Sequence, residues 1–303
     1  MAKKNRKRVG QFQIPALNNA SRTLLANIRF TSIDEKVKTI AVTSTGPDEG
    51  KTVVCANLAC AIADSGKRVL LVDYDPQASL TLSLGWRKPE TLPVTLATLM
   101  GRVLQKQPVH AEEAILHHAE GVDLIPGSIA LSGMEASLDT RQNVLKRVLD
   151  DCRKDYSHVL LDCMPSLGMT TINALAAADS VLIPTIPHYL SVDGLGKLME
   201  SIGRMRRGLN RGLRVEGILI TMASRTTYAR EISELLRTQY GTKIKVFDTV
   251  IPHSIRAAEC SAEGKSIFAY DPKGKVAQAY NALTKEVIQH EKQRQKHRAE
   301  IGR

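Results

Sequence analysis

Short, continuous apolar runs alternate along this chain with longer segments in which apolar positions recur every three or four residues. The continuous runs lack the strict alternation of a strand with one wet face, which predicts strands buried on both faces of a sheet. We expect strands at Lys38–Ser44, Arg68–Asp73, Val122–Ile125, His158–Asp162, Ser180–Pro184, Val215–Thr221 and Val246–Val250. We expect helices at Val53–Ser65, Arg141–Asp155, Thr171–Ala177, Ser191–Gly208, Tyr228–Tyr240 and Lys275–Lys292. Because helices separate these strands, the pattern predicts a doubly wound α/β fold with a mostly parallel sheet.

The ends of the chain differ in pattern from its middle. Residues 1–18 combine charge with Gly10 and Pro15 without periodicity, which predicts a flexible basic arm. Residues 19–30 have the pattern of one amphipathic helix, and residues 31–290 are expected to form the folded domain. A basic C-terminal tail is expected at 291–303.

Composition places the chain among soluble globular proteins, with 43% hydrophobic and 24% charged residues in 303. Charge interrupts every apolar run before the ~18 residues that a membrane helix needs, so we expect no integral membrane segment and a cytoplasmic protein. The five cysteines form no Cys-x-x-Cys pair, which argues against a thiolate zinc site.

The net charge of +11 is concentrated in the two ends, with +5 in residues 1–8 and +3 in residues 289–303. A basic surplus of this kind is typical of proteins that contact polyanions. Solvated tails that only aid solubility explain the same pattern equally well.

A candidate phosphate-binding loop lies between the first strand and the helix that follows it. The segment ends in Gly50-Lys51-Thr52, and its backbone N–H groups, Lys51 and Thr52 suit phosphate oxygens and Mg²⁺. The usual Gly-x-x-x-x-Gly-Lys-[Ser/Thr] pattern requires glycine where this chain has Thr45, so the loop is a deviant version. The alternative is a chance Gly-Lys-Thr at an ordinary helix start. The expected nucleotide-binding residues of the loop are Gly46, Pro47, Asp48, Glu49, Gly50, Lys51, Thr52 and Val53.

Three carboxylates follow expected strands. Asp73 and Asp75 end one strand and Asp162 ends another, so all three should meet at the carboxyl edge of the sheet, where ligands bind in open α/β folds. Such acids can hold a metal-bound water or orient an attacking water, whereas their structural alternative is a helix cap or turn.

Six ordered blocks of this sequence resemble the ParA/Soj partition ATPases, which carry a deviant Walker-A P-loop. The blocks are Lys51-Thr52, Val72–Gln77, Asp162–Gly168, Thr171–Leu175, Ala178–Pro184 and Val250–Glu259. The resemblance implies ATP hydrolysis with Mg²⁺, ATP-dependent homodimers, non-specific duplex DNA binding and a ParB-like stimulating partner. It also implies a nucleoid-associated protein that positions plasmid or chromosomal DNA, or other cargo.

The resemblance also implies roles for individual residues. Lys51 would bind phosphate, Thr52 would be a Mg²⁺ ligand and Asp162 would lie in the outer shell of the metal. Asp75 would orient the attacking water, with Asp73 in support. Pro252 would line the nucleotide site. Members of the family typically carry a signature lysine that reaches the other subunit's phosphates, and Gly46 occupies its position here.

A second resemblance leaves alternatives open. Ser21–Phe30 and Pro47–Thr52 are similar to the cytoplasmic module of bacterial tyrosine kinases, which also lacks the signature lysine. The alternative function is therefore an ATP-binding regulator of a membrane polysaccharide-export complex, and a third is a nucleotide-binding scaffold with negligible turnover. Only Arg22 matches the kinases' Glu-x-x-Arg-x-x-Arg helix motif, and the C-terminal half favours ParA/Soj.

Several arginines are candidate contacts to DNA phosphates, which require positive charge but no base geometry. Arg225 and Arg256 resemble the ParA/Soj contact positions, and Arg204, Arg206 and Arg207 lie together on one expected helix. An exposed basic helix face is the alternative interpretation of that trio. Four phenylalanines and one tryptophan leave little for base stacking, which disfavours single-stranded recognition.

Overall fold

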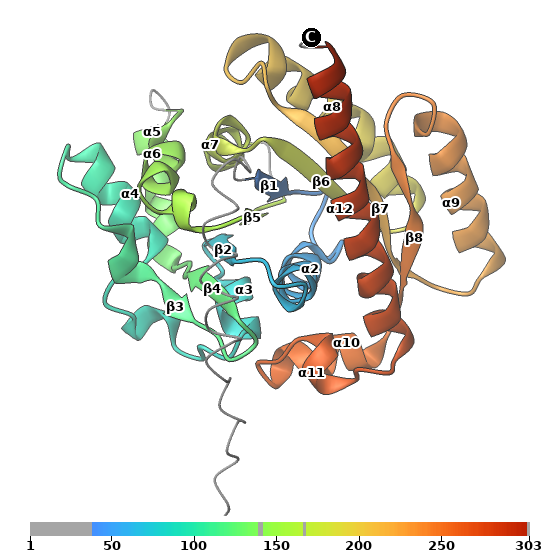
Figure 1. The fold of residues 1–303 in the computed structure, drawn as a ribbon, viewed down its shortest axis with the longest axis horizontal. Coiled ribbons are helices and arrows are strands. Elements are labelled where there is room, and N and C mark those ends of the chain that lie inside the picture. Colours follow the sequence, from blue (N-terminus) through green and yellow to red (C-terminus); the bar gives the residue numbers. More distant parts are fainter. Residues whose placement is uncertain (1–37, 139–141, 166–167, 302–303) are drawn as a thin grey trace, which may run out of the picture. The chain divides into compact units, whose positions relative to one another are not determined.

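A single eight-stranded sheet, ordered β3-β4-β2-β5-β1-β6-β7-β8, runs through the computed structural model (Figure 1). The strands are β1 Lys38–Val42, β2 Val69–Tyr74, β3 Leu116–His117, β4 Val122–Ile125, β5 His158–Cys163, β6 Ser180–Thr185, β7 Arg214–Ala223 and β8 Val246–Pro252. Every neighbouring pair is parallel except β3 with β4. The predicted doubly wound, mostly parallel sheet is therefore confirmed.

The structure describes residues 38–138, 142–165 and 168–301. These residues belong to one compact unit, Val37–Arg303, which is distinct from a unit spanning Met1–Lys36. The arm predicted at 1–18 and the helix predicted at 19–30 lie outside the described residues and stay predictions.

Helices cover both faces of the sheet. They are α2 Lys51–Asp64, α3 Ser79–Ser83, α4 Leu96–Leu104, α5 Glu135–Leu138, α6 Val144–Cys152, α7 Met169–Ala177, α8 Tyr189–Gly208, α9 Thr227–Tyr240, α10 Ile255–Ala262, α11 Ile267–Tyr270 and α12 Lys275–Ile301, with 3-10 turns at Pro89–Thr91, Ala111–Ala114, Ile129–Met134 and Arg153–Asp155. One buried core joins the sheet to α2, α10, α11 and α12, and a second joins it to α4, α6, α7, α8 and α9. Among the described residues, none of the helices combines the length and apolar character needed to cross a bilayer.

Most predicted elements are present, with shifted ends. Helix α2 begins at Lys51 instead of Val53, because Gly50 just before it turns the chain in a left-handed conformation (φ 80°). The last helix does not end near residue 292 but continues to Ile301. The basic tail at 291–303 stays a prediction. The short helices α3, α10 and α11 were not predicted, because four to eight residues carry too little periodicity.

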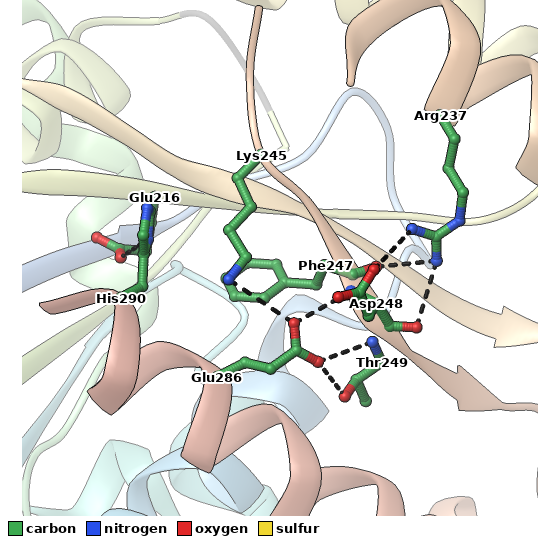
Figure 2. Close-up of polar contacts among 8 residues, drawn as sticks. All are labelled: Glu216, Arg237, Lys245, Phe247, Asp248, Thr249, Glu286 and His290. Atoms are coloured by element: carbon green, nitrogen blue, oxygen red, sulfur yellow. Dashed lines mark hydrogen bonds and ion pairs between the residues drawn. The ribbon is translucent and has the colours of Figure 1, made fainter. Parts of the chain in front are cut away.

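Polar contacts join α12 to the strands beneath it (Figure 2). The Glu286 carboxylate accepts the backbone N–H groups of Asp248 and Thr249, at 3.1 and 2.8 Å. Burial raises the pKa of Glu286, but these bonds and the Thr249 hydroxyl outweigh it and lower that pKa. On the next turn His290 contacts the buried Glu216 at 2.9 Å. Glu286 of α12 thus satisfies two backbone N–H groups of β8, a strand at the edge of the sheet.

The strand register brings the predicted acids together. Asp162 pairs in register with Val42 of β1 on one side and with Asp73 of β2 on the other. The loop that leaves β1 therefore lies beside both carboxylates at the carboxyl edge of the sheet, as predicted.

Candidate active site at the carboxyl edge of the sheet

The loop between β1 and α2 presents an open helix end. Among the described residues no side chain caps the N-terminus of α2, and its first turn contains no acidic residue. The first N–H groups of a helix have no partner within it and carry a partial positive charge, which makes such an end an anion site. Glycine is favoured at position 50 because the backbone has a positive φ there. Space is not the reason, since an added Cβ would make only ordinary van der Waals contacts.

Lys51 is almost fully buried, at 7% exposure. Its Nζ donates to Ser44 Oγ at 2.9 Å and to the Gly46 carbonyl at 3.1 Å. Burial lowers the pKa of Lys51, and the nearby carboxylates of Asp162, Glu49 and Asp75 partly offset that effect. The loop therefore holds an ammonium ion beside the open helix end.

Thr52 and Asp162 form the pair predicted to serve Mg²⁺. Thr52 Oγ1 donates to Asp162 Oδ2 at 2.7 Å, while the buried Asp162 Oδ1 accepts no hydrogen bond from the described residues. Burial, and then the charge of Asp73, raises the pKa of Asp162 to about 8. A buried carboxyl with an unused oxygen beside a threonine hydroxyl fits a hard cation. The described residues contain no group of three or more metal-ligating side chains, so phosphate and water would have to complete the coordination shell.

Asp73 and Asp75 have different surroundings. The fully buried Asp73 accepts the backbone N–H and hydroxyl of Thr81 at 2.8 and 2.6 Å, and burial raises its pKa to about 6. Asp75 is partly exposed, and its Oδ1 accepts the Gln77 N–H at 2.9 Å. Asp73 therefore braces the turn after β2, while Asp75 lies at the open side of the site.

The predicted DNA-contacting arginines divide between two ends of the sheet. Arg225 lies in the loop after β7, whereas Arg256 lies in the first turn of α10, just after β8; both are exposed. The register Ala223↔Pro252 places the ends of the two strands side by side. Arg256 is also ion-paired with Asp271 at 3.2 Å. These two arginines and Pro252 thus lie at the carboxyl edge, the same edge as the P-loop.

Arg204, Arg206 and Arg207 lie at the opposite end. Helix α8 starts just after the carboxyl end of β6 and runs back over 20 residues, ~30 Å, to the start of β7. The trio occupies its last turns, and Arg204 pairs with Glu200 at 3.0 Å. The sequence distinguished the trio from Arg225 and Arg256 but could not place the two groups in space. The structure puts them at opposite ends of the sheet, because α8 is antiparallel to the strands.

Sequence reasoning missed several residues that contact the loop. Ser44 Oγ accepts a hydrogen bond from Lys51 Nζ, and the Thr221 hydroxyl donates to the Glu49 carbonyl at 2.9 Å. Gly194 of α8 packs against Thr45. Ser44 directly precedes the loop and could have been noticed. Thr221 and Gly194 are far from it in sequence and carry no local signal.

Comparison with known proteins decides the family. Residues 37–215 match the model of the AAA domain family. The chain is 37% identical to sporulation initiation inhibitor protein Soj of Bacillus subtilis over 254 residues, covering 82% of this chain and 98% of Soj. It is 38% identical to the chromosome-partitioning ATPase Soj of Thermus thermophilus, covering 84% and 96%. The chain belongs to the ParA/Soj family of ATPases.

Solved structures agree with this membership. Cobyrinic acid a,c-diamide synthase of Mycobacterium smegmatis, solved with ADP and magnesium, superposes with a TM-score of 0.73 at 32% identity, covering 85% of this chain and 96% of that one. The cell division ATPase MinD of Pyrococcus furiosus, 24% identical with a TM-score of 0.66, shares the fold. The predicted ParA/Soj fold and ATPase activity are thereby confirmed. Ser21–Phe30, which carry much of the kinase-module resemblance, lie outside the AAA match and the described residues.

Proposed function

We propose that this ParA/Soj ATPase binds ATP with Mg²⁺ at the loop between β1 and α2 and uses the ATP state to form dimers and bind duplex DNA without sequence preference. The observation that carries the proposal is the uncapped N-terminus of α2, with the buried Lys51 ammonium and the Thr52–Asp162 pair beside it. Relatives named as chromosome partitioning proteins support a role in partition. The proposal extends this role to chromosomal or plasmid DNA, or other cargo, with a ParB-like partner on the nucleoid.

Each residue of the site has a proposed task. Lys51 leaves its contacts to Ser44 and Gly46 and binds the β- and γ-phosphate oxygens, which also accept backbone N–H groups from residues 48–53. Thr52 and Asp162 hold Mg²⁺, which neutralises charge on the phosphates when bound. Asp75 orients the attacking water, and Asp73 supports it by accepting a hydrogen bond from the Asp75 backbone N–H. Pro252 lines the nucleotide site.

The absence of the signature lysine predicts a weak ATP dimer. No atom lies within 4 Å of a Cβ built at Gly46, so a side chain fits there. We expect Gly46→Lys to tighten the ATP-dependent dimer about ten- to hundredfold, because a charged hydrogen bond contributes roughly 1.5–3 kcal/mol. Analytical ultracentrifugation with a non-hydrolysable ATP analogue measures this, with Gly46→Ala as the uncharged control. Equal dissociation constants for the two variants would contradict a phosphate contact across the dimer.

DNA binding at the carboxyl edge should be ionic. We expect Arg225→Ala and Arg256→Ala each to weaken binding of unrelated duplexes alike and to reduce the salt slope by about one unit, since each removes one arginine–phosphate ion pair. Duplex affinity is measured by fluorescence anisotropy against salt concentration, with ATP present. Arg102→Ala, whose arginine pairs with Glu113 at 2.8 Å, is the matched control. An unchanged slope for Arg225→Ala removes that arginine from the interface.

The α8 trio can be tested in the same titration. If Arg206 and Arg207 contact the same duplex as Arg225, their alanine variants should lower the salt slope as well. A normal slope would leave them as an exposed basic helix end, where arginine also stabilises the helix dipole.

A further inference from the structure

Glu49 is a buried carboxylate inside a loop that is proposed to bind phosphates. Only 2% of its surface is exposed. A buried charge is costly unless it is paired and hydrogen-bonded, and a negative charge beside a triphosphate also repels it. Its presence therefore calls for a compensating role.

The Glu49 side chain closes the first half of the loop onto the second. Its Oε2 accepts the N–H groups of both Thr45 and Gly46, at 2.9 and 3.3 Å, and its Oε1 accepts the Thr45 hydroxyl at 3.0 Å. Its backbone carbonyl accepts the Thr221 hydroxyl at 2.9 Å, which ties the loop to the end of β7. One residue thus fixes both the shape of the loop and its position over the sheet.

The same contacts position Lys51. While Glu49 holds the Gly46 N–H, the Gly46 carbonyl accepts hydrogen bonds from Lys51 Nζ at 3.1 Å and from Ser44 Oγ at 2.7 Å. The orientation of the two peptide groups that flank the Gly46 Cα therefore determines where the Lys51 ammonium lies.

The threonine that replaces the usual loop glycine is part of this arrangement. A Cβ built on Gly194 of α8 would lie 2.9 Å from the Thr45 Cβ, so the absence of a side chain at 194 makes room for Thr45. The Thr45 hydroxyl then gives Glu49 a contact that glycine could not provide.

We propose that Glu49 is a positioning residue that orders the loop before nucleotide binds. It does so together with Thr45, which occupies the position of the usual glycine. The proposal rests on the proposed nucleotide site around Lys51. The Glu49 side chain acts through Gly46 and Thr45. A loop that is ordered beforehand loses less conformational freedom on binding, so the residue should affect ATP affinity much more than turnover.

Two substitutions separate hydrogen bonding from charge. Glu49→Gln can keep every side-chain contact, because its amide oxygen can accept both N–H groups and its NH₂ can donate to the Thr45 hydroxyl. Glu49→Ala removes all of them. We expect Glu49→Ala to weaken ATP-analogue binding about ten- to thirtyfold, with the rate at saturating ATP changed less than about threefold. We expect Glu49→Gln to bind at least as tightly as the wild type, since it also removes a negative charge.

Calorimetric titration and single-turnover hydrolysis measure these effects, with Glu90→Gln on an exposed turn as the charge control. Hydrogen exchange gives an independent readout, because the Thr45 and Gly46 amides should exchange faster in Glu49→Ala alone. Unchanged affinity and exchange in Glu49→Ala, or equal losses in the Ala and Gln variants, overturn the positioning role. Lys51→Ala, measured in parallel, tests the site itself: normal ATP binding by that variant overturns the proposed function, whatever Glu49 does.

Discussion

Replacing Lys51 by alanine is expected to abolish ATP binding and hydrolysis. Lys51 is the only basic residue between Thr43 and Thr52, and its buried Nζ already lies beside the open end of α2. No other residue of this loop carries a cation that can take over the contact with the β- and γ-phosphates, so turnover should fall by at least about a hundredfold.

Steady-state hydrolysis and analogue titration measure this loss. Lys88→Ala, at an exposed position, is the matched control and should behave as the wild type. Because Lys51 offsets the charges of Asp162, Glu49 and Asp75, its removal could also weaken the fold, so the thermal midpoint of each variant is compared without nucleotide. Normal turnover by a folded Lys51→Ala protein would rule out this loop as the catalytic site.

Replacing Asp75 by alanine is expected to leave ATP affinity near the wild-type value while turnover is lost. Asp75 lies partly exposed at the carboxyl end of β2, and its contact to the Gln77 N–H supports only the local turn. Its proposed task is to orient the attacking water, which matters for chemistry but not for holding phosphates. We expect a decrease in the single-turnover rate of about 10²–10⁴-fold.

Asp75→Asn separates charge from shape. Asparagine can keep the hydrogen bond from Gln77 but has a neutral amide, so it should lose turnover as alanine does. A loss of ATP affinity in Asp75→Ala as large as that in Lys51→Ala would show that Asp75 serves binding instead of water activation.

Much of the fold could be predicted because strands buried on both faces appear in the sequence as short, continuous apolar runs. The runs around Val69–Tyr74 and His158–Cys163 are continuous and apolar, and each ends in an acid at the carboxyl edge. Parallel pairing then places Asp73 and Asp162 opposite each other, as the register confirms. The Gly50-Lys51-Thr52 motif located the candidate site because it is contiguous in sequence and lies between a predicted strand and a predicted helix.

What could not be predicted depends on contacts distant in sequence or on backbone conformation. No local sequence signal indicates that the Glu49 carboxylate folds back onto Thr45. None indicates either that Gly194, about half the chain away, leaves space for the Thr45 side chain. The separation of the arginines had a similar cause, since it follows from the direction in which α8 crosses the sheet. Short elements such as α10 are fixed by packing, with Cys260 in the core, instead of by pattern.

Whether nucleotide controls assembly and DNA binding is tested by the size of the protein, measured by light scattering after gel filtration with ADP, ATP or a non-hydrolysable analogue, each with and without duplex DNA. We expect a monomer with ADP, weak dimers with the analogue alone, and stable dimers when analogue and any duplex are both present. Lys51→Ala should stay monomeric under all conditions. A size and duplex affinity that are the same with ADP and with the analogue would contradict the proposal that the P-loop nucleotide controls DNA binding.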